Sequence, residues 1–173
     1  KLVKMCTDEE DIILDFFSGS STTAHAVIHL NSSENSNRKF IMVQLPELCK
    51  EGSDAFREGF PTICELGKRR IIISGAKIRE EAGLMAQDLD IGFKVFKLDN
   101  SNLKKWNPDY DDLETSLYDS INNYIDGRTE MDVVYEIMIK MGLDLAYPVV
   151  EHIISDKKVY EIARELQKKC IFV

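Results

Sequence analysis

The chain has 173 residues, of which 44% are hydrophobic and 9% aromatic, so it is long enough to fold around a core. Its 30 acidic and 22 basic residues give a formal net charge of -8 at pH 7, which argues against a surface that binds nucleic acid by itself, because such surfaces need clustered Lys and Arg. The four cysteines lie far apart without a C-x-x-C pair, so the pattern indicates free thiols rather than a zinc site or a disulfide framework. No apolar run reaches the roughly 18 residues of a membrane span, and the sequence predicts a cytoplasmic protein.

The first predicted elements form a βαβ unit. A short apolar strand at residues 12–14 leads into small and hydroxylated residues, and a helix follows from Ala24 to about Leu30, which Thr22 or Thr23 can cap. A second strand covers residues 40–43. The continuous apolar run of the first strand predicts burial on both faces, which is the pattern of a parallel sheet.

A long helix is predicted next, from Thr62 to about Glu81. Its β-branched triplet at residues 71–73 could alternatively be a strand, but apolar residues recurring every three or four positions favour the helix. The basic cluster at residues 68–70 is expected to be a solvated helix face, and Glu65 is expected to pair with Arg69 one turn away.

The composition changes near residue 98. Residues 92–98 are a candidate third strand, and the polar, turn-rich stretch that follows, residues 99–112, predicts a boundary between a βαβ part, 1–98, and a C-terminal part, 99–173.

The C-terminal part combines one clear helix with a hairpin. Thr129 and Asp132 resemble a capping box for a helix that runs to Met141 and that Gly142 ends. The predicted apolar face of this helix is Val133, Val134, Ile137 and Met141. Two further apolar stretches, 149–154 and 158–162, predict a hairpin, and a last short strand is expected at 170–173.

The small residues between the first strand and the first helix predict an anion site. Such a loop lets backbone N–H groups approach a ligand, and the helix N-terminus adds about half a positive charge. A P-loop would need a Lys after the loop, and none follows; a nucleophile elbow would need G-x-S-x-G, which Gly19-Ser20-Ser21 does not supply. An ordinary small-residue turn stays open as an alternative.

Three segments carry a more specific resemblance. D-F-F-S-G-S-S-T-T, residues 15–23, resembles the D-x-F-x-G-S-G-T-T cofactor loop of DNA amino-methyltransferases that use S-adenosylmethionine. With N-R-K-F-I-M-V-Q-L-P-E and F-P-T-I-C-E-L-G-K-R-R-I after it, in that order, the chain is similar to the modification subunit of type III restriction systems, an N6-adenine methyltransferase. The resemblance runs on through G-F-K-V-F-K-L-D-N-S-N to V-Y-E-I-M-I-K-M-G-L-D-L and covers nearly the whole chain.

The resemblance implies an α/β fold: a partial Rossmann-like methyltransferase domain with an incomplete parallel sheet, followed by a mixed helix and β-hairpin region. It also implies a set of residues around S-adenosylmethionine, namely Asp15, Phe16, Phe17, Gly19, Ser20, Ser21, Thr22, Thr23, Gln44, Leu45 and Glu47. Many relatives hold the ribose hydroxyls with an acidic residue where this chain has Gln44, so ribose anchoring is expected either to weaken or to pass to Glu47.

Ser21 departs from the family loop, which has a glycine there. We expect a left-handed or close-approach conformation at this position, which costs a residue with a Cβ about 1 kcal/mol. A cofactor site about five- to tenfold weaker follows from that cost.

The catalytic half of the family is not recognisable in this sequence. The family flips adenine out of the duplex and holds it with a D-P-P-Y type tetrapeptide, for which N-P-D-Y, residues 107–110, is the only candidate and reads as a polar turn. In the family's circular order this tetrapeptide precedes the cofactor loop, and only 14 residues precede Asp15 here. The resemblance therefore implies the C-terminal portion of a larger enzyme, with no catalytic residues of its own and no activity alone.

The resemblance also suggests partners. DNA would bind through the complete parent protein and weakly or not at all to this chain, a restriction subunit would be a partner, and no membrane is involved. Because a methyltransferase sheet has about seven strands and this chain supplies about three, exposed strand edges predict a homodimer or a larger assembly. The rival hypothesis is a non-catalytic interaction module in which the region after Asp99 docks a restriction subunit or a second copy and the loop near Ser21 binds nothing.

A two-histidine metal site is disfavoured. His25 and His29 are one helical turn apart, but Ala26 stands where a zinc protease needs Glu, and no third ligand is recognisable. These histidines are expected to lie on the helix surface or to pack, without a metal.

Overall fold

The computed structural model describes residues 1–83, 89–105, 111–119, 121, 123–164 and 167–172. Contacts divide the chain into two compact units, Lys1–Phe93 and Lys94–Val173. The composition places its predicted boundary five residues later, at residue 98. Among the helices of the described residues, none is long and apolar enough to cross a bilayer.

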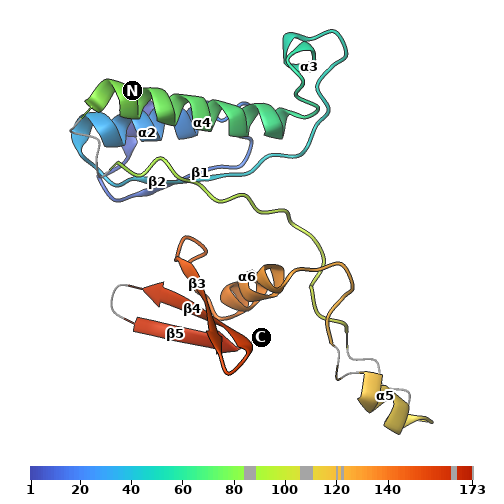
Figure 1. Cartoon of the computed structure of the whole chain (residues 1–173). Coiled ribbons are helices and arrows are strands. Elements are labelled where there is room, and N and C mark those ends of the chain that lie inside the picture. Colours follow the sequence, from blue (N-terminus) through green and yellow to red (C-terminus); the bar gives the residue numbers. More distant parts are fainter. Residues whose placement is uncertain (84–88, 106–110, 120, 122, 165–166, 173) are drawn as a thin grey trace. The chain divides into compact units, whose positions relative to one another are not determined.

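The first unit is built on a βαβ core, as predicted. Strands β1 (Ile12–Asp15) and β2 (Lys39–Met42) pair in parallel, with Leu14 opposite Ile41, and helix α2 (Thr22–Glu34) connects them. Helix α4 (Ile63–Ala82) lies beside α2 on the same side of the strands (Figure 1). The core between them is formed by Ala24, Ile28, Ile71 and Ile78, with Phe40 and Met42 from the sheet.

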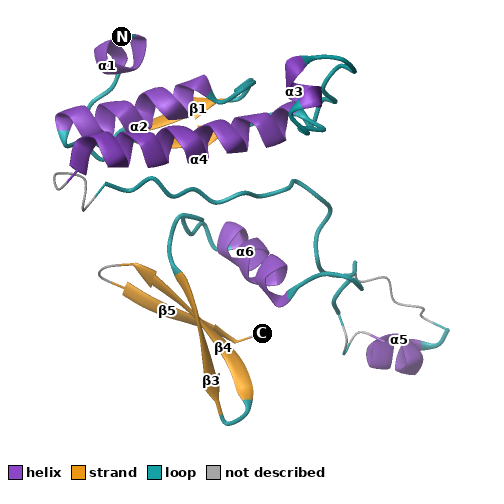
Figure 2. Ribbon diagram, turned by 45° about the horizontal axis from the view of Figure 1, so that its top comes forward, coloured by secondary structure: helices purple, strands orange, loops and turns teal. Residues whose placement is uncertain are grey.

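The other face of this two-stranded sheet is uncovered, so the prediction that the first strand is buried on both faces is wrong. The outward side chains, each about half exposed, are those of Ile12, Leu14, Ile41 and Val43. Both helices pack on the opposite face (Figure 2). Alternating burial along the strands follows from this one-sided cover.

Helix α2 begins and ends differently from the prediction. Its N-cap is Ser21, in a left-handed conformation and without a side-chain cap bond, rather than Thr22 or Thr23. It continues to Glu34 because its last turn has a partner: the buried Asn31 side chain bonds the N–H and C=O of Arg38 in the following loop. Asn35 then ends the helix with a φ of 52°.

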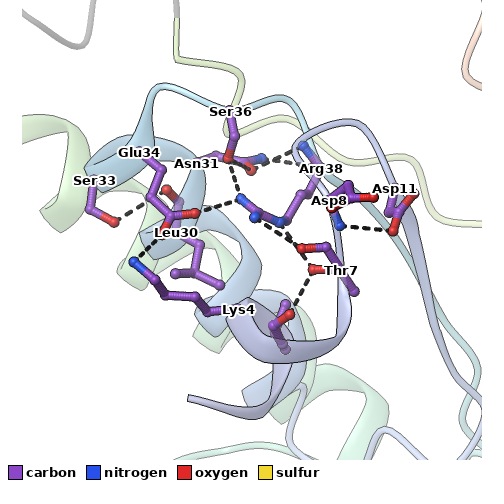
Figure 3. Close-up of polar contacts among 11 residues, drawn as sticks. Lys4, Thr7, Asp8, Asp11, Leu30, Asn31, Ser33, Glu34, Ser36 and Arg38 are labelled. Atoms are coloured by element: carbon purple, nitrogen blue, oxygen red, sulfur yellow. Dashed lines mark hydrogen bonds and ion pairs between the residues drawn. The ribbon is translucent and has the colours of Figure 1, made fainter.

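Arg38 joins this loop to the start of the chain. Its guanidinium is buried, donates to the hydroxyl and carbonyl oxygens of Thr7 at 3.1 and 3.3 Å, and pairs with Glu34 at 2.9 Å. Lys4 reaches the same Glu34 carboxylate at 2.5 Å. The network thereby holds helix α1 (Leu2–Cys6) against α2 (Figure 3).

Helix α4 confirms the prediction of a long helix and excludes a strand at residues 71–73. Thr62 is its N-cap and accepts a hydrogen bond from the N–H of Glu65. Glu65 pairs with Lys68 at 2.5 Å instead of Arg69. The segment that connects β2 to α4 contains a short helix, α3 (Asp54–Arg57).

The predicted third strand at residues 92–98 is extended but belongs to no sheet. Ile91, just before this segment, and Phe93, within it, complete the core of the first unit. In the second unit, the ammonium group of Lys94 donates to the carbonyl oxygens of Leu145 and Tyr147, each at 2.8 Å. Side-chain packing and these polar contacts fix the segment without a ladder of strand hydrogen bonds.

In the second unit, helix α6 (Glu130–Lys140) packs on an antiparallel sheet. The predicted capping box of Thr129 and Asp132 is present. The core consists of Val134, Met138, Tyr160 and Ile162, whereas Met141, predicted on the apolar face, is half exposed. Met141 is the C-cap, so it lies past the end of the face that Met138 completes.

The sheet has the order β3 (Val149–Ile154), β4 (Lys157–Arg164), β5 (Gln167–Phe172). The predicted hairpin is confirmed, and its two turn residues, Ser155 and Asp156, both have positive φ, as type I′ turns require. The last strand begins three residues before the predicted one. The short helix α5 (Leu113–Asp119) precedes α6.

Glu136 of α6 fastens the segment before α5. Its carboxylate accepts from the Ser101 hydroxyl at 2.5 Å and from the Asn102 N–H at 2.6 Å, and it pairs with Lys140 at 2.7 Å. Burial by itself would raise the pKa of Glu136, but these donors outweigh it and lower the pKa to about 2.

Candidate functional site

The loop between β1 and α2 is held by the backbone of β2. The N–H of Val43 donates to the carbonyl oxygen of Asp15 at 2.8 Å, and the N–H of Ser18 donates to the carbonyl oxygen of Val43 at 3.2 Å. The parallel pairing therefore continues past the last strand residues and fixes where the loop leaves the sheet.

Two residues of the loop have a left-handed backbone. Gly19 has a φ of 51°, and nothing lies within 4 Å of where its Cβ would be, so the φ alone favours glycine. Ser21 has φ 60° and ψ 39° and is only 5% exposed. The left-handed conformation expected for Ser21 is thus confirmed, and its N–H closes the turn on the carbonyl oxygen of Ser18 at 2.7 Å.

Asp15 braces both ends of the loop. One carboxylate oxygen accepts from the N–H of Phe17 at 3.2 Å, and the other accepts from the Thr23 hydroxyl at 2.6 Å. Asp15 and Thr23, both predicted site residues, are therefore hydrogen-bonded to each other, and the Thr23 hydroxyl points to Asp15.

Free donors lie at the start of α2. Within the part of the chain that the structure describes, the N–H groups of Ser20, Thr22 and Thr23 have no hydrogen-bond partner. Helix N-termini leave such donors unpaired, and the helix dipole favours negative charge beside them. Donors arranged in this way suit an anionic ligand.

Gln44, at the end of β2, contacts the loop. Its side-chain oxygen accepts from the N–H of Gly19 at 2.8 Å, and its side-chain nitrogen donates to the carbonyl oxygen of Leu45 at 3.2 Å. Both ends of the amide thus have protein partners. The carboxylate of Glu47, three residues on, is exposed and has no partner among the described residues.

Apolar surface flanks the loop. Phe16 and Phe17 are 61% and 80% exposed, and their rings lie 5.0 Å apart. Leu45 is also exposed. Together with the residues above, the structure brings all the residues predicted around the cofactor to the ends of β1 and β2 and the start of α2.

Sequence reasoning missed the contribution of α4. The thiol of Cys64 lies 3.5 and 3.4 Å from the carbonyl oxygens of Gln44 and Leu45. One turn later, the buried Gly67 lies against Ser21. A glycine inside a long helix costs about 1 kcal/mol relative to alanine, and this was the signal in the sequence for a close approach.

His25 and His29 belong to no cluster of metal-ligand type among the residues that the structure describes. No group of three or more His, Cys, Asp or Glu side chains that could hold a metal occurs among the described residues. Burial lowers the pKa of His25, and the positive charges of Arg70 and Lys77 and its neighbour His29 lower it further. The N-P-D-Y tetrapeptide lies outside the described residues.

Known proteins match the part of the chain that carries this loop. Residues 1–53 match the model of a family described as DNA methylase. The EcoP15I Mod subunit of a type III restriction-modification enzyme from Escherichia coli is 42% identical over 97 residues, which are 56% of this chain and 14% of that protein.

Two further type III enzymes give similar matches. The StyLTI Mod subunit from Salmonella typhimurium is 38% identical over 97 residues, which are 56% of this chain and 15% of that protein. The EcoPI Mod subunit from Escherichia phage P1 is 41% identical over 94 residues, which are 54% of this chain and 14% of that protein. The matched stretch thus spans about one seventh of each relative.

Proposed function

We propose that the loop between β1 and α2 binds the methionine end of S-adenosylmethionine. The chain is similar to the Mod subunits of type III restriction-modification enzymes. The observation that carries the proposal is the row of unpaired N–H groups at Ser20, Thr22 and Thr23. It lies within the residues that match the DNA methylase family. A carboxylate fits this row because the N–H dipoles and the helix dipole act on it in the same direction.

The ribose end of the cofactor would lie at the end of β2. The side-chain amide of Gln44 is already hydrogen-bonded to the N–H of Gly19 and the carbonyl oxygen of Leu45, so in this proposal Gln44 supports the loop and does not bind the ribose. Glu47 is the proposed ribose acceptor, because its carboxylate is exposed and an ionised acceptor binds hydroxyl groups about twice as strongly as a neutral one. Phe16, Phe17 and Leu45 provide the apolar surroundings.

The reaction of the parent protein would be methyl transfer to the N6 atom of adenine in DNA. The net charge of -8 supports a division of labour in which DNA is bound by other parts of the parent protein. We expect this chain alone to bind cofactor without transferring methyl groups, and we expect a restriction subunit to be its partner in the cell.

The uncovered sheet face supports a larger, Rossmann-like sheet in the parent protein. In such a fold helices cover both faces of a parallel sheet, and here the outward side chains of Ile12, Leu14, Ile41 and Val43 are about half exposed. Exposed apolar surface and free strand edges favour self-association of the isolated chain. Sedimentation at micromolar concentration should therefore show a dimer or larger species, and a monomer would contradict this part of the proposal.

Calorimetry with S-adenosylmethionine and with its demethylated product tests the cofactor site. We expect saturable binding of one ligand per chain, and the absence of binding at millimolar ligand would overturn the proposal. Glu47→Gln should weaken binding about tenfold, since it removes the charge of the ribose acceptor. Glu51→Gln is the matched control, because Glu51 is also exposed and lies in the same segment between β2 and α3. This variant should bind the cofactor as the unchanged chain does.

A second function, docking of a protein partner without cofactor, is favoured by the apolar surface near α5. Leu117, Tyr118 and Ile121 are 52%, 66% and 78% exposed, and such exposed groups mark contact sites. If calorimetry shows no cofactor binding while the chain binds a restriction subunit, this interaction module is the better description.

A further inference from the structure

Gly67 lies in the interior of α4 and is buried. Glycine is the least favourable residue inside a helix apart from proline, so a physical reason for its presence is expected at the point of contact. That point is the candidate cofactor loop.

A methyl group at position 67 would collide with Ser21. An ideal Cβ built on Gly67 lies 2.6 Å from the Ser21 hydroxyl oxygen, 3.5 Å from the Ser21 Cβ and 3.3 Å from the carbonyl oxygen of Gly19. The distance of 2.6 Å to the hydroxyl oxygen is shorter than the contacts that Cβ atoms make in proteins. The Ser21 backbone cannot easily retreat, because it is left-handed and its N–H and C=O are bonded to Ser18 and His25, so the hydroxyl must turn to another rotamer or the loop must shift.

Each of these two residues departs from the ordinary preference of its position. Serine has a Cβ where the left-handed backbone favours glycine, and glycine lacks one where a helix favours alanine. The two departures face each other, so the space that Gly67 leaves is the space that the Ser21 side chain fills. Gly75, the other buried glycine of α4, faces Ile91 instead, 3.1 Å from an ideal Cβ.

We propose that Gly67 is a positioning residue for the cofactor loop. In this proposal Ser21 and Gly67 form a size-matched pair that sets the distance between the loop and α4. The inference rests on the proposed cofactor function of this loop. Ser21 is the residue immediately before the free N–H groups of Thr22 and Thr23, so displacing it moves the donors that would bind the carboxylate. Cys64, one turn earlier on α4, contacts the other loop at Gln44 and Leu45, and α4 therefore supports both sides of the site.

A double-mutant cycle in the full 173-residue chain tests the pair. The four proteins are the unchanged chain, Ser21→Gly, Gly67→Ala and the double variant. The measurements are S-adenosylmethionine affinity by calorimetry and the unfolding temperature without ligand.

Gly67→Ala alone should weaken cofactor binding about tenfold and lower the unfolding temperature, because Ser21 must move. Ser21→Gly alone should tighten binding about five- to tenfold, since it removes the cost of the left-handed serine. In the double variant the Ser21 hydroxyl oxygen and Cβ are gone, and the carbonyl oxygen of Gly19, at 3.3 Å, is the one close atom left of the three. Binding should therefore return to within about threefold of Ser21→Gly.

Gly75→Ala is the matched control. It places a methyl group against Ile91, so it should lower the unfolding temperature in a way that Ser21→Gly does not restore. Cofactor binding by Gly67→Ala equal to that of the unchanged chain would overturn the inference, and so would a failure of Ser21→Gly to restore it. If the unchanged chain binds no cofactor, the proposed function fails and the positioning role with it, whereas binding without coupling between the two positions defeats this inference alone.

Discussion

The Thr23 hydroxyl donates a 2.6 Å hydrogen bond to Asp15, which joins the first turn of α2 to the end of β1. Thr23→Val keeps the shape of the side chain and removes this bond. We expect the free energy of unfolding to fall by about 1–3 kcal/mol, because a charged acceptor loses its partner, and cofactor affinity to fall with it. Urea denaturation measures the first effect and calorimetry the second.

The control for this change is Thr22→Val, since the neighbouring Thr22 side chain is exposed and makes no hydrogen bond among the described residues. It should alter the free energy of unfolding by less than about 0.5 kcal/mol. Equal losses in both variants would show that the bond to Asp15 contributes nothing specific.

Gln44→Ala should destabilise the chain even without cofactor. The change leaves the N–H of Gly19 without its acceptor at 2.8 Å, and the loss is expected to be about 1–2 kcal/mol in the free energy of unfolding. Gln44→Glu retains an acceptor at this place and should lose less. If Gln44→Ala unfolds like the unchanged chain but loses cofactor affinity, Gln44 contacts the ligand and does not support the loop.

Arg38→Ala should be the most destabilising of these changes. The guanidinium side chain is 4% exposed and bonds Thr7, Glu34 and Ser36 (Figure 3). Removing it takes a buried side chain out of the network and leaves the partly buried oxygens of Thr7 without this donor, so we expect a loss of about 3 kcal/mol or more by urea denaturation. Arg57→Ala, which removes an exposed pair with Asp54, is the control and should cost less than about 0.5 kcal/mol.

Stability should fall as the pH drops below 6.5, and His25 should be one cause. Burial, the positive charges of Arg70 and Lys77, and the neighbouring His29 lower the pKa of His25 below its ordinary 6.5 in the folded chain. Below pH 6.5 the unfolded chain therefore binds a proton that the folded chain resists, and the free energy of unfolding decreases; above pH 6.5 the contribution is fully present.

Urea denaturation between about pH 8 and about pH 5 checks this dependence. His25→Gln should flatten the part of the slope below pH 6.5. His29→Gln should flatten it less, because it removes one cause of the lowered His25 pKa and leaves burial and the charge of Arg70 in place. An unchanged slope in His25→Gln would assign the dependence to other groups.

The elements that the sequence predicted correctly have strong local signals. Thr62 and the helical periodicity after it predicted α4, Thr129 and Asp132 predicted the start of α6, and the apolar stretches around Ser155 and Asp156 predicted the β3–β4 hairpin. In each case the residues that determine the element lie within a few positions of one another. The resemblance to type III Mod subunits is confirmed by the matches with those proteins, whereas cofactor binding by the predicted residues stays a prediction.

The predictions that failed depended on distant neighbours. Residues 92–98 have the composition of a strand, but Phe93 packs against helices and Lys94 bonds carbonyl oxygens about fifty residues away, so no ladder forms. Met141 fits the periodicity of α6, but the helix has already ended there. Local pattern cannot indicate which of several apolar residues the rest of the chain will cover.

The sequence by itself determined the βαβ unit, α4, α6 and the β3–β4 hairpin, in that order. It also determined the chemistry of the loop that opens α2: small residues, an acidic residue before it, and a serine where a glycine was expected. Only the tertiary structure decided how that loop is held. Gln44 reaches Gly19 across 25 positions, and Gly67 makes room for Ser21 across 46. Such contacts arise where the two βα segments and α4 pack together, because the position of one backbone beside another depends on the whole core and not on either stretch of sequence alone.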